Sequence, residues 1–396
     1  MEAEMDKVRI GVIGVAGRGV IAEYWHKPDG DSIVVAGADA KQEFLDRFKE
    51  KINPDAFVTT DYRELVTRDD VDAVAVMSPD FLHEEHAVAA LNAGKHVFCE
   101  KPLAITTESC DRILEAWQRS GKHLMVGFNM RYMPIFRVMK DIVDSGIIGE
   151  IKAVWVRHFV CYGGSYYYHN WNANRNYSTS LLLQKAAHDI DMIHWITGHY
   201  TKKVAAFGSL DFYGGDKPND LSCLNCPDSE TCTEIQTPYY MERQNQCAFR
   251  QEVDVEDNNA VIMELDNGIK ASYMQCHFTP DYFRNYTFIG TEGRVENLDD
   301  DSKVIVKLRD RSNRWKNMAD QVYDVKKFEG GHGGADPKIC QDFIDMILKG
   351  KEPVATPLAG RMSVATGVSA TESLRDSGTL RSIPDLPDSL TSLRTW

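Results

Sequence analysis

Apolar runs alternate with amphipathic stretches through the first third of the chain. Five short apolar or β-branched runs have the length and composition of strands: Val8–Gly14, Ser32–Ala38, Asp72–Met77, His96–Cys99 and Leu124–Gly127. Helices are indicated through Ile21 and Trp25 and over Glu84–Ala93. Strands that alternate with helices are typical of a parallel sheet with helices on both faces. Residues 1–128 are therefore expected to form a doubly wound α/β domain.

The order of the predicted elements changes after about Asn129, where strand-like runs follow one another directly. Some are joined by short turns such as Asp266–Gly268, a good hairpin signal. The runs are Ile151–Phe159, Val204–Tyr213, Asn259–Glu264, Ile269–Cys276, Thr287–Gly290 and Lys303–Leu308. Helices are expected at Tyr132–Ser145, Ser180–Thr197, Pro337–Lys349 and Gly360–Arg375. Residues 129–396 should form an α+β domain on a large, mostly antiparallel open sheet, with an irregular Cys-rich excursion at about 211–251.

Composition and charge narrow the classes of function. The 396 residues exceed the size of a typical single core, and 43% hydrophobic with 26% charged residues is ordinary for a globular protein. Since 59 acidic residues outnumber 45 basic ones, the net charge of −14 would repel nucleic acid and anionic membranes. No apolar run reaches the ~20 residues of a membrane span. The charged start Met1–Lys7 is unlike a signal peptide, and nine cysteines, an odd number, favour a reducing compartment, so we expect a cytoplasmic protein.

A glycine-rich turn follows the first predicted strand and opens the first helix, as in a Rossmann dinucleotide site. Glycines allow a tight turn there and let backbone N–H groups approach a pyrophosphate. The turn contains Gly14, Ala16, Gly17, Arg18 and Gly19, with Ala16 where the G-x-G-x-x-G pattern has its middle glycine. Asp39 ends the second strand, where a carboxylate binds ribose hydroxyls and repels a 2′-phosphate. This favours NAD over NADP, although Lys41 leaves NADP open. If the protein binds no dinucleotide, the glycines would simply form a tight turn and Asp39 would be a solvated side chain.

Several longer motifs occur in a fixed order over most of the chain. They are Ser78-Pro79-Asp80-x-x-His83, Ala90-Leu91-x-Ala93-Gly94-Lys95-His96, Glu100-Lys101-Pro102, Gly127-Phe128-Asn129-x-Arg131-Tyr132 and His188-x-x-Asp191-x-x-x-Trp195. In this order they resemble the glucose-fructose oxidoreductase, inositol dehydrogenase and MocA (Gfo/Idh/MocA) family. Several spaced motifs are more specific than a single glycine turn.

The resemblance implies where the cofactor and the reacting oxygen lie. In that family the Lys of Glu-Lys-Pro is at the nicotinamide end of the cofactor. Lys101 would therefore hydrogen-bond the reacting oxygen while Glu100 and Pro102 fix its backbone, and the Lys101–Pro102 bond can take the unusual cis isomer. A lysine at a strand end in a crevice can also lose its proton readily and polarise a C–O bond. The implied cofactor contacts beyond the glycine turn and Asp39 are Ser78, Pro79, His83, Glu100, Lys101, Pro102 and Asn129.

Members of that family usually carry Asp-x-x-x-His at the start of a helix in the second domain. Here His188 falls on the histidine, but Gln184 stands where the Asp is expected, and a Gln cannot accept a proton. A spacing of four places Gln184 and His188 on one helix face. We expect His188 to be the general base, since imidazole titrates near neutrality, with Lys101 as its electrostatic partner. Asp189 is expected to pair with Lys185 or to be solvated.

Aromatic and polar side chains follow the first strand of the second domain. Aromatic faces flanked by amide, hydroxyl and cationic groups suit a polyhydroxylated ring, although the same segment could be a packing or subunit-contact loop. The candidate substrate-facing residues are Arg131, Tyr162, Tyr166, His169, Trp171, Arg175, Gln184, Lys185 and His188. The segment Gly330–Asp336 could also supply His332, or Asp336 could simply cap the helix that follows.

Four cysteines lie in the excursion: Cys223, Cys226, Cys232 and Cys247. The first pair has the spacing at which two sulfurs from one tight turn bind a tetrahedral zinc ion, and a metal would stabilise a segment with little apolar content. The later spacings are irregular, so free thiols remain the alternative to a structural zinc site.

The sequence leads to one principal hypothesis and two alternatives. We expect an NAD-dependent oxidoreductase that transfers a hydride between nicotinamide and a hydroxyl or keto carbon of a sugar, sugar derivative or cyclitol. The alternatives are an NAD-dependent glycosidase that uses transient oxidation and a non-catalytic sugar and NAD sensor. We expect no nucleic-acid or membrane partner, and the apolar face of an open sheet favours a homodimer or homotetramer.

Overall fold

The protein is described by a computed structural model that covers residues 6–161, 163–241, 244–298, 302–310, 318–326 and 328–395. The chain divides into two compact units. The first comprises Met1–Met133, Lys327–Val364 and Asp385–Trp396, and the second comprises Pro134–Lys326 and Ala365–Pro384. Two C-terminal segments therefore fold with the N-terminal unit, whereas the sequence pattern assigned all of 129–396 to one domain.

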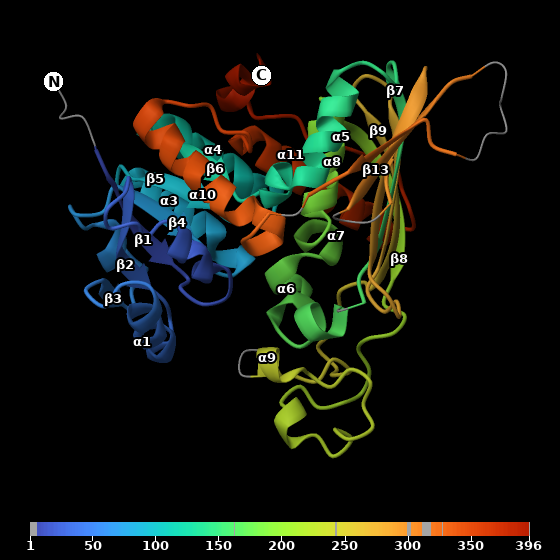
Figure 1. The fold of residues 1–396 in the computed structure, drawn as a ribbon. Helices are drawn as coiled ribbons and strands as arrows, with labels where there is room; N and C mark the ends of the chain where they lie inside the picture. The colour runs from blue at the N-terminus through green and yellow to red at the C-terminus, as the bar shows by residue number, and fades with distance from the viewer. Residues whose placement is uncertain are drawn as a thin grey trace. The chain divides into compact units, whose positions relative to one another are not determined.

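The first unit contains the predicted parallel sheet, coloured blue to teal in Figure 1. Its strands are β1 (Val8–Ile13), β2 (Ser32–Ala38), β3 (Phe57–Thr59), β4 (Ala73–Val76), β5 (His96–Cys99) and β6 (Leu124–Val126). The order is β3-β2-β1-β4-β5-β6 and every pairing is parallel. The chain therefore reverses direction across the sheet between β1 and β4, which is where ligands bind in open α/β sheets. The predicted doubly wound sheet is confirmed.

Helices join these strands and one returns from the far end of the chain. They are α1 (Gln42–Lys51), α2 (Tyr62–Val66), α3 (His83–Asn92), α4 (Thr107–Ser120) and α10 (Gly331–Lys349), with 3-10 helices η1 (Gly17–Tyr24), η2 (Asp80–Leu82), η3 (Asn129–Tyr132) and η7 (Asp388–Thr395). The α10 helix belongs to this unit because its apolar side packs into the unit's core. Phe343 lies 5.6 Å from Phe98 between ring centroids, and the Trp25 indole donates to the Cys340 carbonyl at 3.0 Å. Because α10 buries these side chains in the core of the first unit, this segment from the C-terminal part of the chain belongs to the first unit.

The second unit is built on a nine-stranded sheet. Its strands are β7 (Ile151–Phe159), β8 (Thr201–Ser209), β9 (Asn258–Leu265), β10 (Lys270–Cys276), β11 (Phe283–Gly290), β12 (Gly293–Asn297), β13 (Lys303–Leu308), β14 (Gln321–Asp324) and β15 (Arg381–Ser382). The order is β14-β13-β12-β11-β7-β10-β9-β8-β15. Among these described strands, only β7 and β10 pair in parallel; the other pairs are antiparallel, as predicted.

One face of this sheet is covered and the other carries exposed apolar side chains. Helices α5 (Pro134–Asp144) and α8 (Ala187–Thr197) contact each other and lie on the covered face, beside the sheet in Figure 1. The remaining helices are α6 (Arg175–Ser178), α7 (Leu181–Gln184), α9 (Pro238–Met241) and α11 (Pro357–Arg375), with the short π-helix η4 (Gly164–Tyr168) and the 3-10 helices η5 (Trp171–Ala173) and η6 (Cys223–Asn225). Within the described ranges, no helix combines the length and the apolar character that a membrane crossing requires.

Candidate active site

The glycine turn after β1 is as tight as the motif predicts. Gly14 has a φ of +86°, and a Cβ there would lie 2.6 Å from the backbone nitrogen of Ser78. A Cβ on Gly19 would lie 2.2 Å from the Gly14 carbonyl oxygen. At Gly17, in contrast, a Cβ would meet nothing within 4 Å. A side chain is thus excluded at Gly14, where the turn packs against the end of β4, whereas the space beside Gly17 is free. This arrangement fits a pyrophosphate that approaches the backbone at Gly17.

Ala16 and Asp39 complete the nucleotide end of the first unit. Ala16 is the N-cap of η1, a 3-10 helix where the pattern predicted only a helix. Asp39 follows β2, and its carboxylate accepts from the backbone N–H groups of Val15 at 3.1 Å and Lys41 at 3.2 Å. Burial raises the pKa of Asp39, and these hydrogen bonds oppose that rise. The carboxylate is therefore held beside the glycine turn, where the ribose of a bound dinucleotide is expected.

Lys101 follows β5, and its backbone is held by a chain of polar contacts. The Lys101–Pro102 peptide bond is cis. Oε2 of Glu100 accepts from the backbone N–H of Lys101 at 3.0 Å, and Oε1 accepts from Nε of Arg18 at 2.9 Å. The two ring nitrogens of His83 lie 2.8 Å and 2.7 Å from the carbonyl oxygens of Ser78 and Pro102. His83 and Glu100 thus fix the backbone on both sides of Lys101.

Arg18 faces protein carboxylates, although the sequence motif indicated a cofactor contact. Its Nη1 and Nη2 lie 3.0 Å and 3.1 Å from the two carboxylate oxygens of Asp336. Burial lowers the pKa of Arg18, but Glu100 and Asp336 more than offset this and leave it raised. Asp336 also accepts from Asn129 Nδ2 at 3.0 Å. Since Arg18 follows β1 and Asn129 follows β6, Asp336 joins these two segments and is not simply a helix cap.

The two remaining sequence candidates of the first unit lie close to these residues in the chain. Pro79 is the N-cap of η2, directly after Ser78. Arg131 is buried in η3, where its guanidinium lies 5.9 Å from the Phe128 ring and donates to the carbonyl of Val354. Arg131 therefore holds the segment after β6 against the chain near α10.

The second unit carries His188 in the first turn of α8, half-buried. The expectation that Gln184 and His188 share one continuous helix is wrong. Helix α7 ends at Gln184 and α8 begins at Ala187, because the backbone N–H groups of Lys185 and Ala186 both donate to the Leu181 carbonyl. Gln184 and Lys185 are buried at this break, and Lys185 Nζ lies 5.8 Å from the Tyr167 ring centroid.

Asp189 is neither solvated nor paired with Lys185, contrary to the expectation. It is fully buried and accepts hydrogen bonds from side chains of three strands. His158 Nδ1 lies at 3.0 Å, Tyr273 Oη at 2.8 Å and Arg284 Nε at 2.8 Å, and the Tyr286 hydroxyl donates as well. Burial alone would raise the pKa of Asp189, but the charge of Arg284 and these donors hold it well below its usual range. An ionised Asp189 therefore anchors the first turn of α8, next to His188, to the sheet.

The segment after β7 contains the aromatic candidates. Tyr162 lies outside the described residues. Tyr166 and Trp171 are half-buried in η4 and η5. His169 is buried, and its two ring nitrogens face the carbonyl oxygens of Gln246 and Glu234, the latter at 2.8 Å. With both nitrogens occupied, His169 ties its segment to the cysteine-containing excursion.

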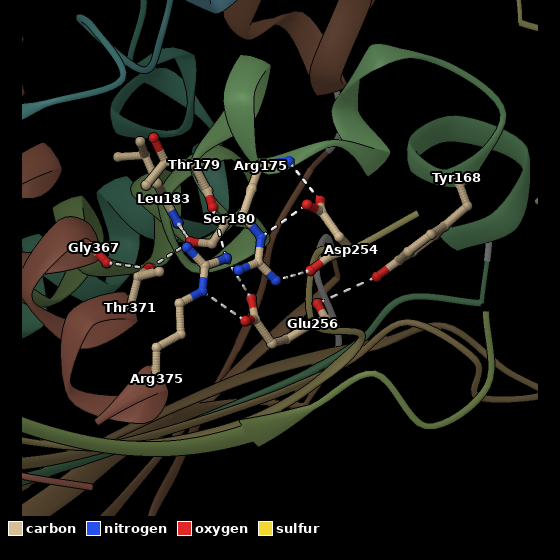
Figure 2. A network of polar contacts seen from close by, with 10 residues as sticks. All are labelled: Tyr168, Arg175, Thr179, Ser180, Leu183, Asp254, Glu256, Gly367, Thr371 and Arg375. Atoms are coloured by element: carbon tan, nitrogen blue, oxygen red, sulfur yellow. Dashed lines mark hydrogen bonds and ion pairs between the residues drawn. The ribbon is translucent and has the colours of Figure 1, made fainter. Parts of the chain in front are cut away.

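Arg175 is held in a polar network shown in Figure 2. Its Nε lies 2.9 Å from Oδ2 of Asp254, and its backbone N–H donates to Oδ1 at 2.7 Å. Nearby, Arg375 Nε lies 2.8 Å from Oε1 of Glu256, whose backbone carbonyl accepts from the Tyr168 hydroxyl at 3.2 Å. These contacts join α6 and α11 to the chain before β9. Arg175 thus has a structural partner at the place where the sequence suggested a substrate contact.

The four cysteines of the excursion line one small cavity. Cys223, Cys226, Cys232 and Cys247 border it together with His169 and Glu234. All nine cysteines are free thiols. In the described part of the chain, no group of three or more His, Cys, Asp and Glu side chains is arranged to hold a metal ion. The geometry therefore gives no support to the structural zinc that the spacing left open.

Comparisons with known proteins agree on the family. A model described as the NAD-binding Rossmann fold of an oxidoreductase family (GFO_IDH_MocA) matches residues 8–128, and the C-terminal alpha/beta domain of the same family matches residues 140–381. The chain is 28% identical over 364 residues to the putative oxidoreductase YteT of Bacillus subtilis, and the match covers 81% of this chain and 83% of that protein. It is 25% identical over 374 residues to myo-inositol 2-dehydrogenase of Thermotoga maritima, or 93% and 97% of the two chains.

A solved structure extends the comparison to the fold. Levoglucosan dehydrogenase in complex with NADH and levoglucosan has a TM-score of 0.75 at 19% identity, over 96% of this chain and 100% of that one. At this identity the likeness shows the shared fold.

Proposed function

Because the chain belongs to the Gfo/Idh/MocA oxidoreductase family and has its NAD-binding Rossmann domain, we propose that it is a dehydrogenase acting on CH–OH groups. It transfers a hydride between NAD and a hydroxyl-bearing carbon of a sugar, sugar derivative or cyclitol. The observation that carries this proposal is the fixed backbone of Lys101. Glu100 holds it at the carboxyl end of β5 and is itself bonded to Arg18 from the glycine turn.

The residues of the first unit fit a dinucleotide. The turn from Gly14 to Gly19 would hold the pyrophosphate through backbone N–H groups, and Asp39 would accept from the ribose hydroxyls. Further contacts would come from residues at the ends of β4, β5 and β6, namely Ser78, Pro79, His83, Glu100, Lys101, Pro102 and Asn129. When bound, NAD supplies the hydride acceptor for alcohol oxidation. The carboxylate of Asp39 disfavours a 2′-phosphate, so NAD is the expected form.

Lys101 and His188 would handle the reacting hydroxyl. Nζ of Lys101 would donate to the reacting oxygen and stabilise the charge that develops on it as its proton leaves. The imidazole of His188 would accept that proton during oxidation and return it during reduction. Gln184 cannot take a proton, so the carboxylate usual in the family is missing here. Asp189 would fix the direction of the His188 side chain through its anchor on the sheet.

The substrate class rests on a relative, on a protein of the same fold and on the candidate side chains. The relative is named myo-inositol 2-dehydrogenase, and the protein of the same fold is levoglucosan dehydrogenase in complex with NADH and levoglucosan. Arg131 in the first unit and Tyr166, Trp171, Gln184 and Lys185 in the second would line the substrate site. Tyr162 remains a candidate from the sequence. His169 and Arg175 have protein partners that make them supports of the loop.

The exposed sheet face of the second unit favours a homo-oligomer. Trp155, Phe207 and Ile262 are 50%, 67% and 65% exposed. Ile262 and Trp155 both pair with Ser272, and Phe207 is two residues from the partner of Ile262, so all three point to the same side. An apolar face of this kind is expected to be covered by a second copy of the chain.

A panel of purified compounds tests the proposal. Cyclitols, aldoses, anhydrosugars and glycosides are incubated with NAD and, separately, with NADP, and reduced cofactor is followed by absorbance. Formation of NADH with at least one polyol, and faster turnover with NAD than with NADP, is expected. Cleavage of a glycoside without net NADH would instead indicate a glycosidase that uses transient oxidation. Cofactor binding without turnover of any compound would indicate a sensor.

A further inference from the structure

A single residue between α6 and α7 has a backbone conformation that is rare for a residue with a side chain. Thr179 has a φ of +62° and a ψ of −59°, and the backbone N–H of Ser180 donates to the Ser178 carbonyl at 2.7 Å. These values describe a γ-turn with a positive φ at its central residue, which is rare and strained. Thr179 is also β-branched, and a positive φ is most unfavourable for such residues. A turn of this kind persists only where contacts from the surrounding structure hold it.

Arg375 of α11 holds the carbonyl side of the turn. Its Nη2 donates to the Thr179 carbonyl oxygen at 2.9 Å, as Figure 2 shows. Its Nε and Nη2 also lie 2.8 Å and 3.0 Å from the two carboxylate oxygens of Glu256, and a bidentate pair of this kind fixes the plane of the guanidinium. The Arg375 and Glu256 side chains are 27% and 9% exposed. The donor that reaches Thr179 is therefore oriented by a largely buried carboxylate.

The hydroxyl of Ser180 holds the other side of the turn. It caps α7 by accepting from the backbone N–H of Leu183 at 3.1 Å, and it lies 2.5 Å from Oγ1 of Thr371. Oγ1 of Thr371 also lies 2.7 Å from the Gly367 carbonyl oxygen, which can only accept. The one hydrogen of the Thr371 hydroxyl therefore points to Gly367, and Ser180 is the donor to Thr371. A continuous chain of hydrogen bonds, drawn in Figure 2, thus joins the cap of α7 to α11.

Close backbone packing adds a third contact between α7 and α11. A Cβ on Gly367 would lie 2.8 Å from the Leu182 carbonyl oxygen and 3.0 Å from Cα of Leu183, so a side chain there would clash with α7. The side chains of Leu181, Leu182 and Leu183 are at most 1% exposed. A helix of four residues is too short to be stable without such packing. The direction of α7 is therefore set by α11 and by the turn at Thr179.

The segment that α7 directs carries two of the proposed substrate contacts. Gln184 is the last residue of α7 and Lys185 follows it, and both are buried. His188 lies in the first turn of α8, which the buried Asp189 fastens to the sheet. The anchor at Asp189 therefore acts mainly on His188. The turn at Thr179 acts mainly on Gln184 and Lys185.

We propose that Thr179 and Arg375 are positioning residues for the substrate site: the strained turn, held by the Arg375 guanidinium, sets the direction of α7 and with it the place of Gln184 and Lys185. This inference rests on the proposed function, which assigns these two side chains to the substrate. The strain makes the arrangement sensitive to its holding contacts, because a turn without them relaxes toward a negative φ. Thr179 and Arg375 act through α7 and are not catalytic residues.

Steady-state kinetics of the full-length protein, with NAD and a polyol that it oxidises, test this role. Arg375→Ala removes the hold on the turn. The double variant Thr179→Gly with Arg375→Ala also removes the strain, since glycine adopts a positive φ freely. Ser377→Gly is the control for strain relief, because Ser377 has a φ of +53° and lies in the same unit. Arg381→Ala is the control for a lost ion pair, because Arg381 and Asp376 form a pair with side chains 37% and 57% exposed.

We expect Arg375→Ala to raise the KM for the polyol by roughly tenfold or more with a smaller change in kcat, as for displaced substrate-positioning groups. The Kd for NAD should be unchanged, since the glycine turn lies in the other unit. The double variant should recover part of the loss, because the two changes act on one turn and are not additive. Both controls should have the KM and kcat of the wild type.

Hydrogen exchange of the peptide that spans α7 reports on the same turn without turnover. The Leu183 amide, which donates to the Ser180 hydroxyl, should exchange faster in Arg375→Ala than in the wild type and more slowly again in the double variant. Unchanged exchange in Arg375→Ala would show that the guanidinium does not hold the turn and would overturn the proposal.

The kinetic result decides between positioning and a purely structural role. Folded Arg375→Ala with a lower Tm but a KM within about twofold of the wild type overturns the proposal. If Arg375→Ala does not fold, Thr371→Val removes the acceptor of the Ser180 hydroxyl instead and should raise the KM in the same direction; a wild-type KM there also overturns the proposal. Failure of the proposed function would appear differently, as wild-type protein that forms no NADH with any polyol.

Discussion

Nη2 of Arg284 lies 2.7 Å from Oδ1 of Asp189, and the two side chains are 8% and 0% exposed. Arg284 is on β11 and Asp189 is on α8, so this ion pair fastens the helix to the sheet. The residue before Asp189 is His188, the proposed base. The rotation of α8, and with it the side of the helix on which His188 lies, is therefore fixed by a buried charge pair.

Replacing Asp189 by Asn should destabilise the protein strongly. The change would leave the Arg284 guanidinium buried without its counter-charge, which typically costs about 3–5 kcal/mol. Urea denaturation of the wild type and the variant measures the difference. Asp266→Asn is the control, because Asp266 forms a half-exposed pair with His199 and should contribute less than about 1 kcal/mol. A loss for Asp189→Asn as small as that of the control would contradict the anchoring role.

The stability of the fold should decrease on acidification because His158 is buried as a neutral ring. Burial, together with the charge of Arg284, lowers its pKa to about 3 from the ordinary value of 6.5. Between pH 6.5 and about 3 the unfolded chain binds a proton at this position that the folded chain does not. The free energy of unfolding therefore falls as the pH falls through this window, by up to about 1.4 kcal/mol per pH unit.

The variant His158→Asn isolates this contribution. It keeps an N–H donor for Asp189 but has no titrating group, so its stability should depend less steeply on pH in the same window. The other buried histidines, such as His86 with its pKa lowered to about 4, titrate in both proteins and cancel in the comparison. Denaturation curves at several pH values measure both slopes. Equal slopes for the two proteins would rule out a neutral buried His158.

Features encoded within a short stretch of sequence could be predicted. The turn at Gly14, the strand that precedes Lys101 and the Asp266–Gly268 hairpin depend on neighbouring residues and on local backbone preferences. The alternation of strands and helices was sufficient for the parallel sheet, and strand-like runs that follow one another directly were sufficient for the mostly antiparallel one. These parts of the fold follow from periodicity and turn chemistry.

Contacts between distant segments could not be predicted in this way. Arg18 and Asp336 are 318 residues apart, and Asp189 meets Arg284 across 95 residues. Nothing in the local pattern around Arg18 distinguishes a cofactor contact from a carboxylate partner brought in by α10. The apolar residues Cys340 and Phe343 indicate that this helix is buried on one side. They do not indicate which of the two units it packs against.

Removing the imidazole of His188 should lower turnover while leaving the cofactor site intact. We expect His188→Ala to reduce kcat by ~10²-fold or more, the usual contribution of a general base. The Kd for NAD should be unchanged, since the glycine turn and Asp39 lie in the other unit. His199→Ala is the matched control, because His199 is partly exposed and pairs with Asp266. Turnover of His188→Ala within a few-fold of the wild type would remove His188 from the mechanism.

A charged side chain on the open sheet face should break the proposed oligomer. Phe207→Glu combined with Ile262→Glu places two like charges on neighbouring positions of the apolar face, and burying them in an interface is unfavourable. Light scattering is expected to show a larger assembly for the wild type and the mass of a single chain for the double variant. Leu224→Glu is the control, because Leu224 is 64% exposed and belongs to η6 rather than to a strand of the sheet. A wild-type protein that is already monomeric would contradict the proposal.

The central claim is that a hydride moves between a polyol carbon and the nicotinamide. The most direct measurement uses a polyol from the panel that carries deuterium on the carbon to be oxidised, followed by mass spectrometry of the cofactor. The proposed function predicts that the reduced cofactor gains the deuterium in wild-type protein and that Lys101→Ala lowers the rate sharply. Reduced cofactor without deuterium, or an oxidised polyol without any reduced cofactor, would contradict it.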